Sequence, residues 1–195
     1  RRGWLAEPGL YHRPPPPLAT PQLQTRWLKR ARGPIVYEAL TFESGYEPDA
    51  AEPGRDRWMS YSANRTAHAV ILRHASAPRP WLVCVHGYLM GHTGFSFWIF
   101  DAIRHHRELG LNLALPVLPF HGPRREGRFS GEGFLGHDVL DTIHAEAQTI
   151  WELRRLLGWI RAQGAPSVGL HGASLGGYNA ALLAGYRQLR EAPSA

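Results

Sequence analysis

The chain has 195 residues, of which 44% are hydrophobic and 19% are charged. This composition excludes global disorder and fits one folded domain or most of one. The net charge of +6 suggests an anionic partner. However, no nucleic-acid-binding motif accompanies the densest basic cluster, residues 26–32, so we expect no nucleic-acid partner.

Residues 1–33 are expected to form a Pro/Arg-rich extension, in which four consecutive prolines at 14–17 exclude regular structure. Residues 34–195 are expected to form a partial α/β domain. The first residue is arginine and the last four are Ala-Pro-Ser-Ala, so we interpret the chain as a fragment.

Strand and helix patterns alternate after residue 33. The expected strands are residues 34–42, 67–73, 81–85, 111–119 and 166–171, and the expected helices are residues 97–109, 145–163 and 175–190. The connections 44–66 and 121–138 are expected to be loops. This order predicts the α/β class, with a mostly parallel sheet and helices on both faces.

The single cysteine, Cys84, excludes an internal disulfide and predicts a buried thiol in a reducing, cytoplasmic compartment. No secretory signal is evident at the N-terminus. Residues 81–100 lack Asp, Glu, Lys and Arg, but their histidines and glycines favour a buried strand and a loop over a membrane span. We therefore expect no transmembrane segment.

The sequence Gly172-Ala173-Ser174-Leu175-Gly176 matches the G-x-S-x-G pattern, with an apolar strand before it and a helix after it. This context predicts a nucleophile elbow, in which a tight strand-to-helix turn exposes the Ser174 hydroxyl. Gly172 and Gly176 are needed because such a turn leaves no room for their side chains. The alternative is a glycine-rich turn with an incidental serine.

A second motif, His86-Gly87-Tyr88-Leu89, follows the strand at 81–85. Catalysis by Ser174 requires two N–H donors for an oxyanion, and we expect them to be the backbone N–H groups of Leu175 and Tyr88. Leu89 is the second choice for the donor of this loop. Gly87 lets the backbone approach the substrate, and His86 is expected to shape the loop by hydrogen bonding instead of acting as a base.

These two motifs, in this order, resemble the alpha/beta-hydrolase superfamily over residues 34–190. The segment 118–124 (Leu-Pro-Phe-His-Gly-Pro-Arg), together with Gln148, Trp159 and the motif 172–178, is similar to the alpha/beta-hydrolase-domain-eighteen-like branch. The resemblance implies Ser–His–acid hydrolysis of an ester or related acyl compound, with no metal and no organic cofactor. The implied partner is a small-molecule acyl substrate, and the oligomeric state is left open.

The chain departs from the family pattern after the nucleophile, where the acid and the histidine should follow. Only 21 residues follow Ser174, and they contain no Asp and no His. Glu191, at the end of the last expected helix, is in the wrong place. The acid and base are therefore expected downstream of this chain, and residues 1–195 alone are expected to be inactive and prone to aggregation.

The loop 121–138 contributes further candidates at the edge of the sheet where ligands bind. We expect His121 and Arg124 to contact substrate, the arginine through a carboxylate or phosphate group. The alternatives for Arg124 are hydrogen bonding within the loop and plain solvation, and they are favoured over substrate contact. Asp138 and Asp141 are expected at a helix start or on the surface.

Other functions remain open from the sequence. Peptidases, acyltransferases and thioesterases share this elbow, because the fold does not determine the substrate. A non-catalytic binding module with the same fold is the alternative outside enzymology.

Overall fold

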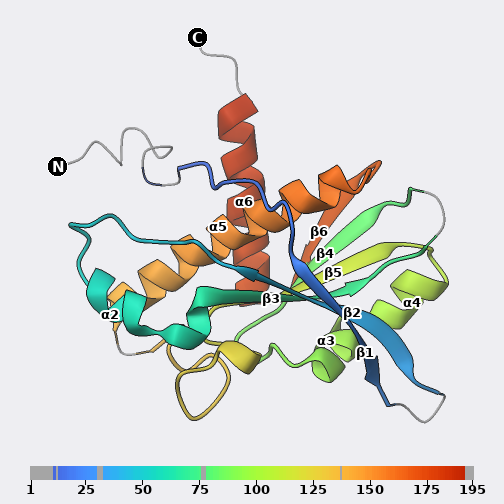
Figure 1. Ribbon diagram of the computed structural model, residues 1–195, viewed down its shortest axis with the longest axis horizontal. Helices are drawn as coiled ribbons and strands as arrows, with labels where there is room; N and C mark the ends of the chain where they lie inside the picture. Colours follow the sequence, from blue (N-terminus) through green and yellow to red (C-terminus); the bar gives the residue numbers. More distant parts are fainter. Residues whose placement is uncertain (1–10, 12, 30–32, 76–77, 137, 192–195) are drawn as a thin grey trace.

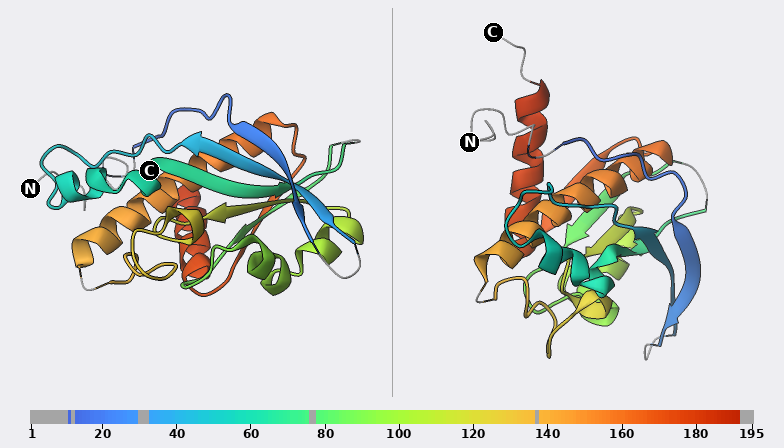
Figure 2. Two further views of the ribbon diagram at one scale, coloured as in Figure 1. Left: turned by 60° about the horizontal axis from the view of Figure 1, so that its bottom comes forward. Right: turned by 60° about the vertical axis from the view of Figure 1, so that its left-hand side comes forward.

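The computed structural model describes residues 11, 13–29, 33–75, 78–136 and 138–191. They form a six-stranded sheet covered by helices on both faces (Figures 1 and 2). The strands are β1 (Gln22–Leu28), β2 (Ile35–Glu43), β3 (Thr66–Leu72), β4 (Trp81–Val85), β5 (Asn112–Val117) and β6 (Val168–Gly172). The helices are α2 (Arg55–Ser60), α3 (Thr93–Ile99), α4 (Ala102–Arg107), α5 (Val139–Ala162) and α6 (Leu175–Glu191), with short 3-10 turns η1 (Ser62–Arg65) and η2 (Gly122–Arg124).

The strand order is β1-β2-β3-β5-β4-β6. β4 lies between β5 and β6 and is parallel to both, whereas β1, β2, β3 and β5 pair antiparallel in succession. The α/β class is thus confirmed, but the sheet is mixed, not mostly parallel. Its parallel part carries the carboxyl ends of β4, β5 and β6 at one edge, where α/β proteins place their ligands.

Side chains of β4 alternate between two hydrophobic cores. Val83 and Val85 join the larger cluster, to which α5 contributes residues such as Leu153 and Ile160. Cys84 points to the other face and packs with Phe97 of α3 and its neighbours. Because both faces are buried, β4 tolerates an unbroken apolar sequence, which is the pattern from which it was predicted.

Three elements differ from the sequence-based expectation. β1 lies within the segment that was expected to be an extension. The sequence did not predict this strand, because six of its seven residues are exposed and it shows no alternating apolar pattern. The expected helix 97–109 is two helices, since Asp101 adopts a left-handed φ of 44° between α3 and α4. The expected loop 44–66 contains α2 and η1. Residues 30–32 of the basic cluster lie outside the described residues.

α5 begins at Val139, earlier than expected, because the Asp138 carboxylate accepts a hydrogen bond from the Leu140 N–H (2.9 Å). Asp138 is therefore a helix cap, as predicted. No helix in the described part of the chain is both long and apolar enough to cross a membrane.

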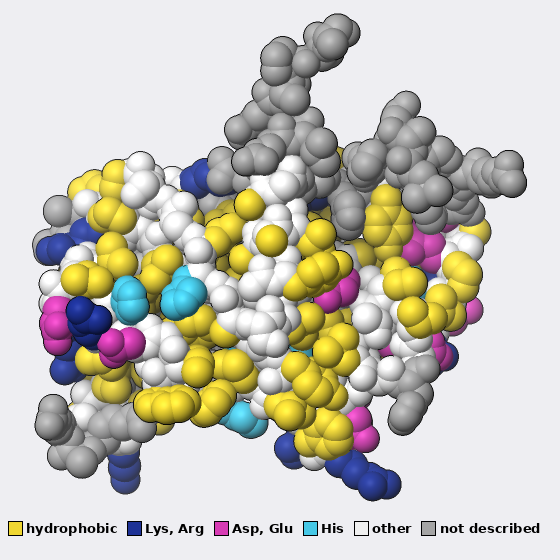
Figure 3. Space-filling model, turned by 180° about the vertical axis from the view of Figure 1, so that it is seen from behind, with side chains coloured by type: hydrophobic (Ala, Val, Ile, Leu, Met, Phe, Trp, Pro, Cys, Tyr) yellow, Lys and Arg dark blue, Asp and Glu magenta, His cyan; other side chains and the backbone are white. Residues whose placement is uncertain are grey.

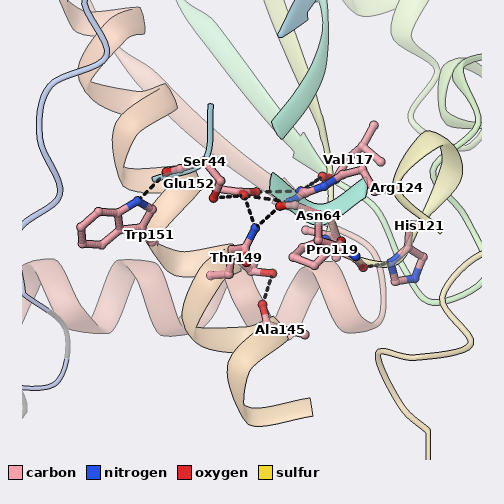
Figure 4. A network of polar contacts seen from close by, with 12 residues as sticks. Ser44, Asn64, Val117, Pro119, His121, Arg124, Ala145, Thr149, Trp151 and Glu152 are labelled. Carbon is pink, nitrogen blue, oxygen red and sulfur yellow. Dashed lines mark hydrogen bonds and ion pairs between the residues drawn. The ribbon is translucent and has the colours of Figure 1, made fainter. Parts of the chain in front are cut away.

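A buried ion pair links α5 to the loop after β5 (Figure 4). The Arg124 guanidinium binds both carboxylate oxygens of Glu152, at 2.7 and 2.8 Å. Arg124 also donates to the carbonyl of Val117 (2.8 Å), while Ser44 donates to Glu152 (2.5 Å). The Nη2 of Arg124 also donates a hydrogen bond to the backbone carbonyl of Asn64 in η1 (3.1 Å). One charge pair thus ties five segments together: α5, η2, β5, η1 and the residues after β2.

We expect Glu152→Gln to lower the free energy of unfolding by about 3–5 kcal/mol, because it leaves the Arg124 charge buried without a counter-ion. Glu108→Gln is the matched control, since Glu108 pairs with Arg104 on an exposed surface and should cost less than about 1 kcal/mol. Urea unfolding of both variants makes the comparison. Equal losses in the two variants would show that the buried pair is not structurally important.

Candidate active site

Ser174 lies in the tight turn that joins β6 to α6. Its φ of 52° lies in the left-handed region, which is costly for a residue with a side chain. Hydrogen bonds from the Gly176 N–H to the Ala173 carbonyl (2.9 Å) and from the Tyr178 N–H to the Ser174 carbonyl (3.1 Å) hold the turn. Ser174 is exposed, so the strained turn presents it to solvent at the carboxyl edge of the sheet.

The two glycines of the motif occupy positions with no space for a side chain. A Cβ on Gly176 would overlap the Val85 carbonyl and lie 2.6 Å from the His86 carbonyl oxygen. A Cβ on Gly172 would overlap the Gly176 carbonyl. The turn thus packs backbone against backbone, between its own two arms and against the end of β4.

The loop after β4 lies directly against this turn. A Cβ on Gly87 would come within 3.3 Å of the Ser174 Cβ and 3.0 Å of the Ala173 carbonyl oxygen. The backbone N–H of Tyr88, the next residue, is therefore close to the serine. Neither this N–H nor that of Leu175, the first residue of α6, donates to a protein acceptor within the described residues. The role of these two N–H groups as oxyanion donors stays a prediction.

His86 connects the ends of β4 and β5. Its Nδ1 donates to the Gly87 carbonyl (2.8 Å), and its Nε2 accepts from the Leu118 N–H (3.0 Å). Burial, with the nearby His121 ring adding to it, lowers the pKa of His86 to about 3. A neutral ring with both nitrogens occupied shapes the loop and has no lone pair available to take a proton from Ser174.

His121 is completely buried, which corrects the expectation that it contacts substrate. Its Nδ1 donates to the Pro119 carbonyl (2.8 Å), and its ring packs edge-on against those of His86 and Tyr88. Burial lowers its pKa to about 4. His121 therefore supports the Tyr88 loop from behind.

Arg124 likewise does not reach a substrate, because it is completely buried and its guanidinium is engaged by Glu152 and two backbone carbonyls. The alternatives of bonding within the loop and of solvation are also wrong, because the partners of Arg124 lie on β5, η1 and α5. Sequence reasoning missed Glu152, because the helical pattern alone gives no sign that a charged residue of α5 faces the interior.

Ser130 is a second residue that the sequence did not single out. Its hydroxyl donates to the Met90 carbonyl and accepts from the Gly122 N–H (2.9 Å). It therefore joins the loop after β4 to the loop after β5. A serine in a glycine-rich loop carries no sequence signal for such a contact.

The described residues provide no hydrogen bond between Ser174 and a histidine or a carboxylate. His105 and His106 bind backbone carbonyls of their own segment, and Asp141 binds Arg57 and Tyr61. No group of three or more metal-binding side chains occurs among the described residues. The base and acid expected downstream of the chain thus stay a prediction.

The surface near the serine includes exposed apolar side chains. Leu89 follows Tyr88 and is 56% exposed, and Tyr178, whose N–H binds the Ser174 carbonyl, is 55% exposed. Figure 3 shows hydrophobic side chains gathered over the rear face of the molecule. Such surfaces are typical of sites that bind apolar ligands or further protein.

No protein-family model matches the chain. Two curated relatives, Uncharacterized protein MT2702 of Mycobacterium tuberculosis strain CDC 1551 and Uncharacterized protein Rv2627c of strain ATCC 25618, are 48% identical to it over 184 residues. The match covers 94% of this chain but 43% of each relative. The chain thus spans less than half the length of these relatives.

Solved structures share the fold at low sequence identity. A candidate acetyl xylan esterase from Bacteroides fragilis aligns over 94% of this chain and 48% of its own, with a TM-score of 0.58 and 13% identity. A cold-adapted esterase from an Arctic intertidal metagenomic library aligns over 83% of this chain and 59% of its own, with a TM-score of 0.50 and 16% identity. The chain therefore has an α/β fold similar to that of these two proteins.

We expect Gly176→Ala to destabilise the protein strongly, because the added methyl group would overlap the Val85 carbonyl. Gly158→Ala is the control, since Gly158 lies within α5 with open space around it and should gain up to about 1 kcal/mol. Thermal unfolding followed by circular dichroism measures both. A Gly176→Ala protein as stable as wild type would show that the turn is not packed as described.

The buried histidines predict a loss of stability in acid. Because the pKa values of His86 and His121 are lowered from 6.5 in the folded state, the unfolded chain takes up protons first as the pH falls below 6.5. Folding should weaken by about 2 kcal/mol per histidine at about pH 5. His86→Gln cannot be protonated, so its urea midpoint should fall less than that of wild type between about pH 7.5 and 5. An equal fall would contradict a neutral, buried His86.

Proposed function

We propose that this chain carries the nucleophile of a serine hydrolase that acts on an ester or related acyl compound. The observation that supports the proposal is the left-handed φ of Ser174 in a turn where Gly172 and Gly176 have no room for side chains. A residue with a side chain is kept in such a conformation where the surrounding structure imposes it, and such strain is concentrated at functional sites.

In the proposed reaction the Ser174 hydroxyl attacks the carbonyl carbon of the substrate and forms a tetrahedral oxyanion. The backbone N–H groups of Leu175 and Tyr88 donate hydrogen bonds to this oxyanion. The N-terminus of α6 adds a favourable field, because its partial positive charge lies beside the developing negative charge. Collapse of the intermediate expels the alcohol, and water then releases the acid from the acyl-serine.

The mechanism also requires a histidine that takes the Ser174 proton and an acid that orients this histidine. His86 and His121 are unsuited to this role, because both rings are buried and neutral, and His86 has both of its nitrogens bonded to backbone groups. We therefore keep the prediction that the base and the acid lie downstream of Ala195. No metal or organic cofactor enters the proposed chemistry.

The substrate class is proposed from the surroundings of the serine. The apolar side chains of Leu89 and Tyr178 suit the hydrocarbon part of an acyl substrate better than a highly charged one. Both structural neighbours are described as esterases, which supports an ester in preference to a peptide. The buried, unpaired Cys84 is compatible with the cytoplasmic location that we propose.

Fluorophosphonate labelling of the complete protein tests the proposal. We expect covalent modification of wild type and none of Ser174→Ala, because an activated serine is the group that attacks phosphorus. Ser167→Ala is the control, since Ser167 is also exposed but precedes β6. It should be labelled as strongly as wild type, and peptide mapping should place the label on Ser174.

Absence of labelling in a protein with a cooperative unfolding transition would contradict the proposal. It would favour the non-catalytic binding module, in which the residues from Gly172 to Gly176 serve only as a structural turn. Equal labelling of wild type and Ser174→Ala would place an activated nucleophile elsewhere and would also reject Ser174.

A further inference from the structure

β1 forms one edge of the sheet. Its seven residues, Gln22–Leu28, pair with β2 along one side, and no strand of the described chain lies along the other side. In Figures 1 and 2 this strand forms the outer border of the sheet, far from α6. The backbone N–H and C=O groups on its free side must therefore bind water or another strand.

The usual protections against strand pairing are missing from β1. It contains no proline, no lysine and no acidic residue. Its one charge, Arg26, donates a hydrogen bond within the strand to Gln24 (2.6 Å). Leu23 and Trp27 lie on the same face of the strand and are 37% and 64% exposed. Natural edge strands are commonly shielded by charges, prolines or bulges, so this edge is open to association.

We propose that β1 is a homodimerisation edge, at which β1 of a second copy pairs antiparallel with it about a two-fold axis through Thr25. The two sheets then form one continuous sheet across both chains. This inference is independent of the proposed hydrolase function, because β1 lies at the border of the sheet opposite to β6 and the Ser174 turn.

The proposed register follows from the sequence of β1. With the axis at Thr25, Leu23 lies opposite the partner's Trp27, which joins two exposed apolar side chains. Gln24 lies opposite the partner's Arg26, which allows an amide–guanidinium hydrogen bond. All seven residues of each strand take part, and no two like charges face each other.

Other registers are less favourable. An axis at Gln24 pairs only residues 22–26, so fewer backbone hydrogen bonds form. An axis at Arg26 places two guanidinium groups directly opposite each other, which is repulsive. With an axis between two residues, a residue whose N–H and C=O groups point toward the partner strand would lie opposite a residue whose groups point toward its own β2. No hydrogen-bond ladder would then form.

Cysteine cross-linking of the complete protein tests this register. In Thr25→Cys the two thiols would face each other, with Cβ atoms about 4.5–5.5 Å apart, and diamide should oxidise them to a disulfide-linked dimer. In Gln22→Cys the two thiols would be about 20 Å apart, so little dimer should form. Combining Gln22→Cys with Leu28→Cys should restore the cross-link. The native Cys84 is 1% exposed and should remain unreacted.

Opposite charges at one position provide a second test, in the chain without added cysteines. Gln24→Glu would create attractive pairs with the partner's Arg26, and Gln24→Arg would create repulsive ones. We expect the dimer dissociation constant, measured by sedimentation equilibrium, to fall in the first variant and to rise in the second, each by roughly two- to thirtyfold.

A wild-type chain that sediments as a monomer at every concentration would overturn the proposal. A folded Thr25→Cys protein that diamide leaves monomeric would also overturn it. So would a Gln22→Cys protein that cross-links as efficiently as Thr25→Cys, or two Gln24 variants that shift dimerisation in the same direction.

Discussion

The candidate site depends on one close approach, in which the backbone of Gly176 packs directly against the end of β4. A side chain at this position would overlap the Val85 carbonyl, so β6, the turn and the start of α6 are held against β4 without any intervening atoms. The same contact brings Gly87 against the turn and so sets Tyr88 beside Ser174. The strain of the Ser174 backbone is thus balanced by packing of two neighbouring parallel strands.

The loops around this contact are held by polar groups that are themselves buried. Arg124 and Glu152 join the loop after β5 to α5, and Ser130 joins that loop to the one after β4. The neutral imidazole of His86 bridges the same two loops, through hydrogen bonds to Gly87 and Leu118. Buried polar groups of this kind are stable only when their partners are in place, which makes the loop positions mutually dependent. The loops at the carboxyl ends of β4 and β5 are therefore held in place, which is the preorganisation that the proposed oxyanion stabilisation requires.

The parts of the fold predicted from sequence are those with a periodic or local signal. β4 was predicted with its observed bounds, because a strand buried on both faces is continuously apolar. The elbow was predicted because its steric demand for glycine is visible as a pattern. β1 was missed because an exposed edge strand has neither alternation nor an apolar run, and its pairing with β2 is a tertiary contact.

The errors in the site have a common physical cause. Arg124 and His121 belong to residue types that favour the surface, and their position after β5 suggested contact with substrate. Their burial depends on Glu152 and on the packing of His86, both of which are distant in sequence or on another strand. A single sequence carries no record of such long-range pairing, whereas the glycine pattern of the turn around Ser174 is local and is therefore visible in the sequence.

The most direct measurement is a crystal structure of the complete protein after reaction with a fluorophosphonate, which leaves a tetrahedral phosphonyl group in place of the acyl intermediate. We expect a bond from phosphorus to the Ser174 Oγ, with one phosphonyl oxygen about 2.7–3.1 Å from the N–H groups of both Leu175 and Tyr88. A phosphonyl group on Ser174 whose oxygens lie away from these two N–H groups, or a group attached to another residue, would contradict this expectation.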